Sequence, residues 1–351
     1  MEKLENIASV KVRQSNFELL RIIAMFMVLI LHADFQALGA PDKTEIINHP
    51  VAATLKIFFE MASIVAVNVF VLISGWFGIR PSVKGITKFI FQCLFFSLGI
   101  YTFFLIKGDV VFSFRGLADC FAMMGGGYWF ITSYICLYLL SPVINVFIEN
   151  AERNLYRDIL IAFFVFQTLY GFCSSGASFF LRGYSAISFI GLYMLAGFLK
   201  RYVDIQRYKK ITCFRVYFFT TLSLTFLYIG GEYFDCLAIS SRCISYTNPL
   251  VIISALSLLL LFSKIDITSK FINSIGASSF AVYLLHTNSN IYSSFFIQSI
   301  KDMMQNYTIF AFFNVVWCVC VWFVIAILID KLRVILYCMI SVRLFKRNIV
   351  E

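Results

Sequence analysis

Two ionisable residues in one apolar segment, Arg21 and His32, are the first candidates for chemistry. At about 100° and about 1.5 Å per residue, a helix over 17–37 presents both side chains on one face, about 16 Å apart. An arginine can hold phosphate through paired hydrogen bonds, and an imidazole can take a proton from a hydroxyl or carry an acyl group itself. The pair would therefore fit an acyl donor that carries an anionic group such as phosphate. The structural alternative, a snorkelling arginine and a core histidine, stays open.

Further polar residues fall in apolar segments, where ionisable groups are costly and are functional candidates. Asp34 could orient the ring of His32 if the helix ends near it. Lys56 and Glu60 have i,i+4 spacing, which favours a structural ion pair, with Glu60 on the acceptor side of a site as the alternative. His286 either lines the same cavity as His32 or forms a hydrogen bond between helices. Because no acidic or thiol cluster accompanies the histidines, we expect no metal.

A second group of candidates follows the segment 52–77. Ser74 and Gly75 lie near its end, where small residues allow close approach of a backbone or a ligand. Three cations follow them: Arg80, Lys84 and Lys88. They could bind an anionic cofactor, although ordinary basic flanking of a membrane span explains them equally well. Trp129, at the start of another apolar segment, is either an interface anchor or part of a cavity.

The elements that must position these residues are membrane helices. The chain has 351 residues, of which 60% are apolar and 14% are charged, including 41 Phe. These proportions exclude a water-soluble enzyme and a disordered chain. The long unbroken apolar runs predict an all-α membrane protein, in which each helix satisfies its own backbone. In such a protein the net charge of +10 indicates basic cytoplasmic loops rather than nucleic-acid binding.

Windows of about 20 residues predict a bundle of about ten transmembrane helices. Placing both termini in the cytoplasm puts most of the 29 Lys and Arg residues on the inner side. The chain then forms a single domain over 1–351. Its basic tail, 331–351, either lies on the inner leaflet or flanks the last span. The expected spans are 17–37, 52–77, 86–106, 128–148, 156–173, 184–200, 213–230, 249–263, 276–297 and 308–330.

Taken together, these segments resemble the acyltransferase-3 family of multi-pass membrane acyltransferases. Arg21 through His32 is similar to the Arg-x10-His motif of that family, and Phe70 through Trp76 is similar to its Phe-x-x-x-Ser-Gly segment. Two further matches, in order along the chain, are Tyr128-Trp129-Phe130-Ile131 and Tyr283-Leu284-Leu285-His286. The chain departs from the family's Arg-x-x-Arg motif, in whose place stand Arg80, Lys84 and Lys88.

The resemblance implies transfer of an acyl group, usually acetyl from cytoplasmic acetyl-CoA, to a hydroxyl of a cell-surface or exported bacterial polysaccharide. It implies that His32 is catalytic, that Arg21 contacts the donor or shapes its site, and that Ser74, Trp129 and His286 line the cavity. The expected partners are an acyl-CoA donor, a carbohydrate acceptor and the lipid bilayer of the bacterial plasma membrane, without nucleic acid. A carrier or polymerase of lipid-linked glycans is the alternative. It fits the ten spans, but it does not need an arginine and a histidine on one stripe.

Overall fold

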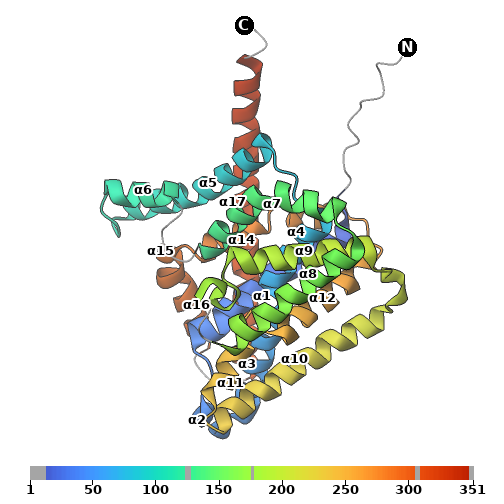
Figure 1. Ribbon diagram of the computed structural model, residues 1–351. Coiled ribbons are helices and arrows are strands. Elements are labelled where there is room, and N and C mark those ends of the chain that lie inside the picture. The colour runs from blue at the N-terminus through green and yellow to red at the C-terminus, as the bar shows by residue number, and fades with distance from the viewer. Residues whose placement is uncertain (1–12, 123–127, 175–177, 305–308, 348–351) are drawn as a thin grey trace, which may run out of the picture.

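The computed structural model describes residues 13–122, 128–174, 178–304 and 309–347, and these form a bundle of helices with no strand in the described ranges (Figure 1). The first half contains α1 (Ser15–Leu31), α2 (Lys43–Asn48), α3 (Pro50–Ser63), α4 (Ala66–Phe77), α5 (Val83–Lys107), α6 (Phe114–Ala122), α7 (Trp129–Asn150) and α8 (Arg153–Phe166). The second half contains α9 (Ala186–Tyr202), α10 (Lys210–Tyr233), α11 (Leu237–Cys243), α12 (Pro249–Ser263), α13 (Lys270–Gly276), α14 (Phe280–His286), α15 (Ser289–Ile291), α16 (Ile297–Met303) and α17 (Ile309–Arg347).

Seven stretches of the described chain are long and apolar enough to cross a membrane, which makes this a multi-pass membrane protein. Three of the ten expected spans are not among the seven. The segments 184–200 and 249–263 correspond to α9 and α12, which have 17 and 15 residues. Helix α9 packs against α4, and α12 packs against α4 and α10. The prediction of ten spans with both termini in the cytoplasm therefore stays a prediction.

The expected span 276–297 is broken rather than continuous. It runs from the end of α13 through a turn at 277–279, α14, α15 and the π-helical turn η5 (Tyr292–Phe296) to the start of α16, with non-helical residues also between α14 and α15. Tyr128 at the start of α7 stabilises the break, because its hydroxyl donates to the carbonyl of Leu284 at 3.0 Å and accepts from the amide of Asn288 at 3.2 Å. Such interruptions are tolerated at membrane depth only where protein or a cavity surrounds them.

Helix α1 is the central element of the bundle. Its residues belong to both hydrophobic clusters of the core, one shared with α3, α4, α9 and α12, the other with α5, α14 and α17. The α-helix ends at Leu31 and continues as a π-helix, η1 (His32–Leu38), so that His32 lies at the junction of the two. A π-helical turn changes the direction of the following side chains and is frequent at functional sites. All residues from Arg21 to Leu31 lie in one α-helix.

Close packing of α4 against α9 explains the Ser74-Gly75 pair. A Cβ at Gly75 would lie 2.3 Å from the carbonyl oxygen of Tyr193 in α9, a distance that no side chain tolerates. Helix α4 ends at Phe77, and Gly78 follows with a positive φ of 72°, a conformation that favours glycine. The small residues that the sequence singled out therefore allow two helix backbones to touch.

The last helix extends further than the sequence predicts. We expected a basic tail from residue 331, but α17 is helical through Arg347, and its apolar part runs over Ala311–Met339. Arg333 is buried and bonds to Asp330 at 2.6 Å, while Lys331 donates to the carbonyl of Ser274 at 2.7 Å. The Lys331 contact joins the expected start of the tail to α13, whereas the Arg333–Asp330 pair lies within α17. Residues 348–351 lie outside the described residues.

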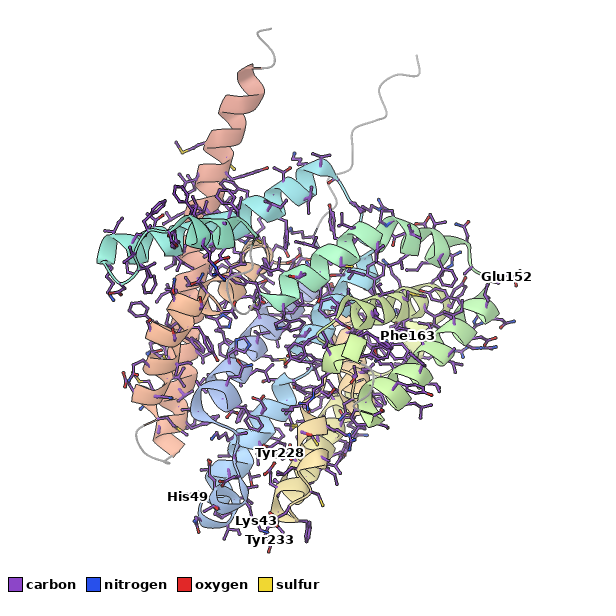
Figure 2. All side chains as sticks on the ribbon, turned by 60° about the vertical axis from the view of Figure 1, so that its left-hand side comes forward. Lys43, His49, Glu152, Phe163, Tyr228 and Tyr233 are labelled. Atoms are coloured by element: carbon purple, nitrogen blue, oxygen red, sulfur yellow. The ribbon has the colours of Figure 1, made fainter. Side chains whose placement is uncertain are left out.

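The end of the bundle farthest from the C-terminal part of α17 carries the helix α2 and the end of α10 (Figure 1). Figure 2 shows Lys43 and His49 beside Tyr233 at this end. Lys43 forms an ion pair with Asp235, which follows α10. Helix α3 begins here with a proline at its first position, where no backbone hydrogen bond is lost.

Candidate active site

A cavity of about 350 Å³ opens beside the first half of α1 and is called here the Arg21 cavity. Arg21, Ser74 and Arg80 line it together, although they come from two helices and a turn. Ser74 donates to the carbonyl of Phe70 at 3.0 Å, and its oxygen lies 3.4 Å from the hydroxyl of Tyr134 on α7. The structure thus brings two of the predicted donor-side residues, Arg21 and Arg80, around one space with Ser74, which was expected on the acceptor side with Trp129.

Arg21 has an acidic partner that the sequence analysis did not consider. Its Nη1 donates to Oε1 of Glu18 at 2.6 Å, and Arg13 donates to the same oxygen at 3.2 Å. Glu18 is almost fully buried, whereas the side chain of Arg21 is 31% exposed. A guanidinium has five N–H donors, so one bond to Glu18 leaves it able to bind a further anion. Glu18 fixes the position of the cation that lines the cavity.

The turn that carries Arg80 is held by hydrogen bonds from two other helices. The hydroxyl of Tyr193 accepts from the backbone N–H of Ile79 at 2.7 Å, and the amide of Asn145 donates to the Ile79 carbonyl at 2.7 Å. Lys84 and Lys88, by contrast, are exposed on the first turns of α5 and do not line the cavity. Of the three predicted cations, only Arg80 joins Arg21.

His32 lines a second, smaller cavity, called here the His32 cavity. Trp129 also lines it, together with Tyr184 and Tyr246, which lie far from it in the sequence. The ring of Trp129 is 4.3 Å from that of Tyr184 and stacks on Tyr246 at 6.1 Å, so the three rings form one apolar surface with two hydroxyl groups. The arrangement is typical of a site for a ligand that has both apolar faces and hydroxyls.

His32 and His286 contact each other directly. Nδ1 of His32 lies 2.8 Å from Nε2 of His286, and Nδ1 of His286 lies 2.5 Å from the carbonyl oxygen of Val282. His286 is 1% exposed and does not line either cavity. It was expected either to line the cavity or to bond between helices, and the structure places it in the second arrangement, with the catalytic candidate itself as partner.

The two cavities follow one another along the same three helices. Met25, Phe70 and Phe130 of the His32 cavity lie one helical turn from Arg21, Ser74 and Tyr134 of the Arg21 cavity. Aromatic rings separate the two spaces and are called here the aromatic constriction: Phe70, Phe89, Phe130, Tyr134 and Phe280. Helices α1, α4 and α7 therefore contribute to the walls of both a cationic cavity and a histidine cavity, with the aromatic constriction between the two.

The structure places Asp34 and Glu60 outside the walls of both cavities. Asp34 is buried and lines a different space, with Lys56 and apolar residues of α17, because η1 turns it away from His32. The expected ion pair between Lys56 and Glu60 is wrong. Lys56 instead contacts Glu45 at 3.3 Å, because α2 folds back over the start of α3. Glu60 is buried, and its Oε2 has no hydrogen-bond partner among the described residues.

Comparison with known proteins gives one decisive result. A family model described as an acyltransferase domain matches residues 14–329, nearly the whole chain. The chain belongs to the acyltransferase-3 family. No curated protein and no solved structure gives a significant match. The chain is thus a membrane acyltransferase, and the match includes α1, α4, α7 and α14, which carry the residues described above.

Sequence reasoning missed several residues of this acyltransferase site. Glu18 had a local signal, because it precedes Arg21 by three residues on one helix, a spacing at which side chains meet. Tyr134 also had one, since it follows Phe130 by one turn of α7. Tyr184 and Tyr246 had none, because they approach Trp129 only through the packing of distant segments.

Proposed function

We propose that this acyltransferase moves an acetyl group from acetyl-CoA to a hydroxyl of a carbohydrate. One observation carries the proposal: α1, α4 and α7 line both a cavity with two arginines and a cavity with a histidine, one behind the other. Arginines can bind the phosphates of a donor, and a histidine can accept a proton from a hydroxyl. A carrier or polymerase of lipid-linked glycans would not need an arginine and a histidine on one helix.

The lining of the Arg21 cavity fits the phosphate-bearing part of coenzyme A. Arg21 and Arg80 are partly exposed cations on its wall, and Tyr134 and Ser74 add hydroxyl groups. In the proposed reaction, the thin chain that carries the thioester of acetyl-CoA would pass between the rings of the aromatic constriction. When bound, acetyl-CoA would supply the activated acetyl thioester. In this arrangement Arg21 and Arg80 bind and orient the phosphates, and the aromatic constriction excludes water from the reacting end.

His32 does the proton transfer in the proposed reaction. Its Nδ1 is engaged by His286, so Nε2 is the ring nitrogen left for substrate. Nε2 takes the proton of the attacking hydroxyl as the carbon–oxygen bond forms, and it returns that proton to the sulfur as the carbon–sulfur bond breaks. No proton is gained or lost over the cycle. A covalent route, in which Nε2 itself accepts the acetyl group, would use the same atom.

The acceptor side of the proposal rests on the rings around His32. A sugar has apolar C–H faces and hydroxyl edges, and the surface formed by Trp129, Tyr184 and Tyr246 offers stacking area with hydroxyl groups beside it. We propose an exported or cell-surface polysaccharide as the acceptor. The Arg21 cavity would then face the cytoplasm and the His32 cavity the outer side of a bacterial plasma membrane, with both termini inside.

The test uses the full chain in lipid nanodiscs with acetyl-CoA labelled on the acetyl group and a panel of polysaccharides. We expect label in an ester that mild base releases, for the wild type and for His49→Ala, whose histidine lies at the end of the bundle that carries α2 (Figure 2) and lines neither cavity. We expect no such label for His32→Ala. Normal transfer by His32→Ala would overturn the assigned role.

A cell-based experiment distinguishes the alternative. Surface glycan from cells that lack the chain is compared with glycan after complementation with the wild type or His32→Ala. The acyltransferase proposal predicts glycan of normal length that lacks acetate unless the wild type is present. Shortened or missing glycan with unchanged acetate content would favour a carrier or polymerase instead.

A further inference from the structure

The contact between His32 and His286 carries an inference about where the ring protons lie. Each neutral imidazole has one N–H donor and one bare nitrogen acceptor, and the partners of a ring decide which is which. The starting point is the backbone carbonyl of Val282, which can only accept. Nδ1 of His286 lies 2.5 Å from that oxygen, so Nδ1 carries the proton. Nε2 of a neutral His286 is then a bare acceptor.

The proton position on His286 determines the donor in its contact with His32. Nε2 of His286 lies 2.8 Å from Nδ1 of His32, and a bare nitrogen needs a donor. Nδ1 of His32 therefore carries the proton, and Nε2 of His32 keeps its lone pair. Positive charge on either ring would change this order, but both rings lie inside the bundle, and no described Asp or Glu forms an ion pair with them. Burial of an unpaired charge is costly, so the neutral pair is favoured.

The surroundings of His286 hold it rigidly in this role. Its ring lies between that of Phe296, at 5.2 Å, and that of His32, at 4.9 Å. The helix that carries it is bound to α7 through the hydroxyl of Tyr128 and the carbonyl of Leu284. Thr287, which follows it, donates to the carbonyl of Tyr283 at 2.6 Å. In this packing, Nδ1 of His286 faces the Val282 carbonyl and Nε2 faces His32.

We propose that His286 is a positioning residue that holds His32 as the Nδ1–H tautomer, with the Nε2 lone pair free for the acceptor hydroxyl. This deepens the proposed function and rests on it. A carboxylate in this place would hold the same tautomer with a charge. Asp34, which the sequence suggested for that place, lines another cavity, and the structure assigns the place to an uncharged ring that is itself oriented by a carbonyl.

The tautomer can be read without any assay of activity. The chain has three histidines, so ring labelling with ¹⁵N gives one pair of nitrogen signals each from His32, His49 and His286. In nanodiscs at pH 8, we expect a protonated Nδ1 and a bare Nε2 for His32, with a scalar coupling between its Nδ1 and Nε2 of His286. His49→Gln removes the third pair and leaves the others in place. A wild-type His32 that carries its proton on Nε2 would overturn the proposal.

Two variants of His286 test the consequence for catalysis. His286→Gln keeps an acceptor oxygen near the position of Nε2, whereas His286→Leu has no acceptor. For Leu, we expect His32 to move its proton to Nε2 and kcat to fall by about 10²-fold or more, within the range for a lost general base. KM for acetyl-CoA should not change, because His286 does not line the Arg21 cavity. For Gln, we expect the Nδ1–H tautomer and at least a tenth of the wild-type kcat.

The outcomes separate this proposal from the proposed function. Equal kcat for His286→Gln and His286→Leu, with both proteins monodisperse, would overturn the positioning role even if the wild type transfers acetate. A wild type that transfers no acetate would overturn the proposed function, while the ¹⁵N signals would still decide where the protons lie. If His286→Leu fails to fold, the wild-type coupling and the Gln variant decide the matter.

Discussion

Replacing Arg21 by Met should have two separable effects, one on stability and one on the donor. Met keeps much of the apolar stem that packs near Phe77 but removes the charge. The structural effect comes from Glu18, which is 3% exposed and loses its 2.6 Å bond to Arg21. The functional effect comes from the Arg21 cavity, which loses one of its two arginines.

The size of each effect follows from the surroundings. Removal of one partner from a fully buried ion pair costs about 3–5 kcal/mol. Arg13 still donates to Glu18, and Arg21 is 31% exposed, so we expect about 1–3 kcal/mol here. Loss of charge-assisted hydrogen bonds to a phosphate also costs about 1.5–3 kcal/mol, which corresponds to about 10- to 150-fold in KM for acetyl-CoA.

A second substitution distinguishes the two effects. Glu18→Gln removes the carboxylate that Arg21 neutralises, so the double variant Arg21→Met/Glu18→Gln should unfold close to the wild-type temperature. Its KM for acetyl-CoA should stay as high as that of Arg21→Met alone. The measurements are thermal unfolding in detergent and initial rates of acetyl transfer over a range of acetyl-CoA concentrations. Glu18→Gln by itself is the matched control for the loss of the carboxylate.

The reasoning is refuted by a double variant that recovers both its unfolding temperature and its KM. Arg21 would then serve only to neutralise a buried carboxylate, and the donor would bind elsewhere. An unchanged unfolding temperature in Arg21→Met would refute the structural half, since it would mean that Arg13 alone satisfies Glu18.

Three further predictions concern other parts of the molecule. Gly75→Ala should destabilise the protein by about 1–3 kcal/mol, because the added Cβ would push α4 away from Tyr193. The unfolding temperature should fall by several degrees. The control Gly230→Ala, whose Cβ would enter open space, should leave the unfolding temperature unchanged. Trp129→Leu should raise KM for the carbohydrate acceptor by about 2- to 10-fold through lost ring stacking, and leave KM for acetyl-CoA unchanged; an equal rise for both substrates would contradict the division into two cavities. Asp330→Asn should leave the buried Arg333 guanidinium without its carboxylate and lower the folded yield in membranes. Asp330→Asn combined with Arg333→Met should recover the yield. An equal yield for the wild type, the single variant and the double variant would show that the pair does not stabilise the fold.

Much of the site follows from local sequence. The spacing of Arg21 and His32 predicts one helical stripe, and the structure keeps the residues from Arg21 to Leu31 in one α-helix. Ser74 and Gly75 indicate close packing before any partner is known, because only small side chains permit it. The contact between Glu18 and Arg21 could also be predicted locally, since the two residues are one helical turn apart. It was missed because acidic residues are common at the ends of membrane spans, so that Glu18 did not stand out.

Sequence reasoning does not decide how many of the apolar helices cross the bilayer. Hydropathy measures transfer from water to an apolar surrounding, and it cannot distinguish lipid from the interior of a protein. Helices α9 and α12 match the expected segments 184–200 and 249–263, and they pack against other helices, so whether they cross the bilayer stays a prediction. The segment 276–297 reads as one span, yet it breaks after His286, and only the contact with Tyr128 explains how the break is stabilised.

The sequence by itself determined that this chain is a helical membrane acyltransferase with an arginine and a histidine on its first apolar helix. The helical membrane class and the shared helix face depend on composition and on spacing within one helix. The acyltransferase assignment rests on the family match over residues 14–329. Only the tertiary structure decided that His286, which is 254 residues from His32, is its hydrogen-bond partner, and that Asp34 is not. A contact between distant segments depends on how every intervening helix packs, and no local pattern contains that information.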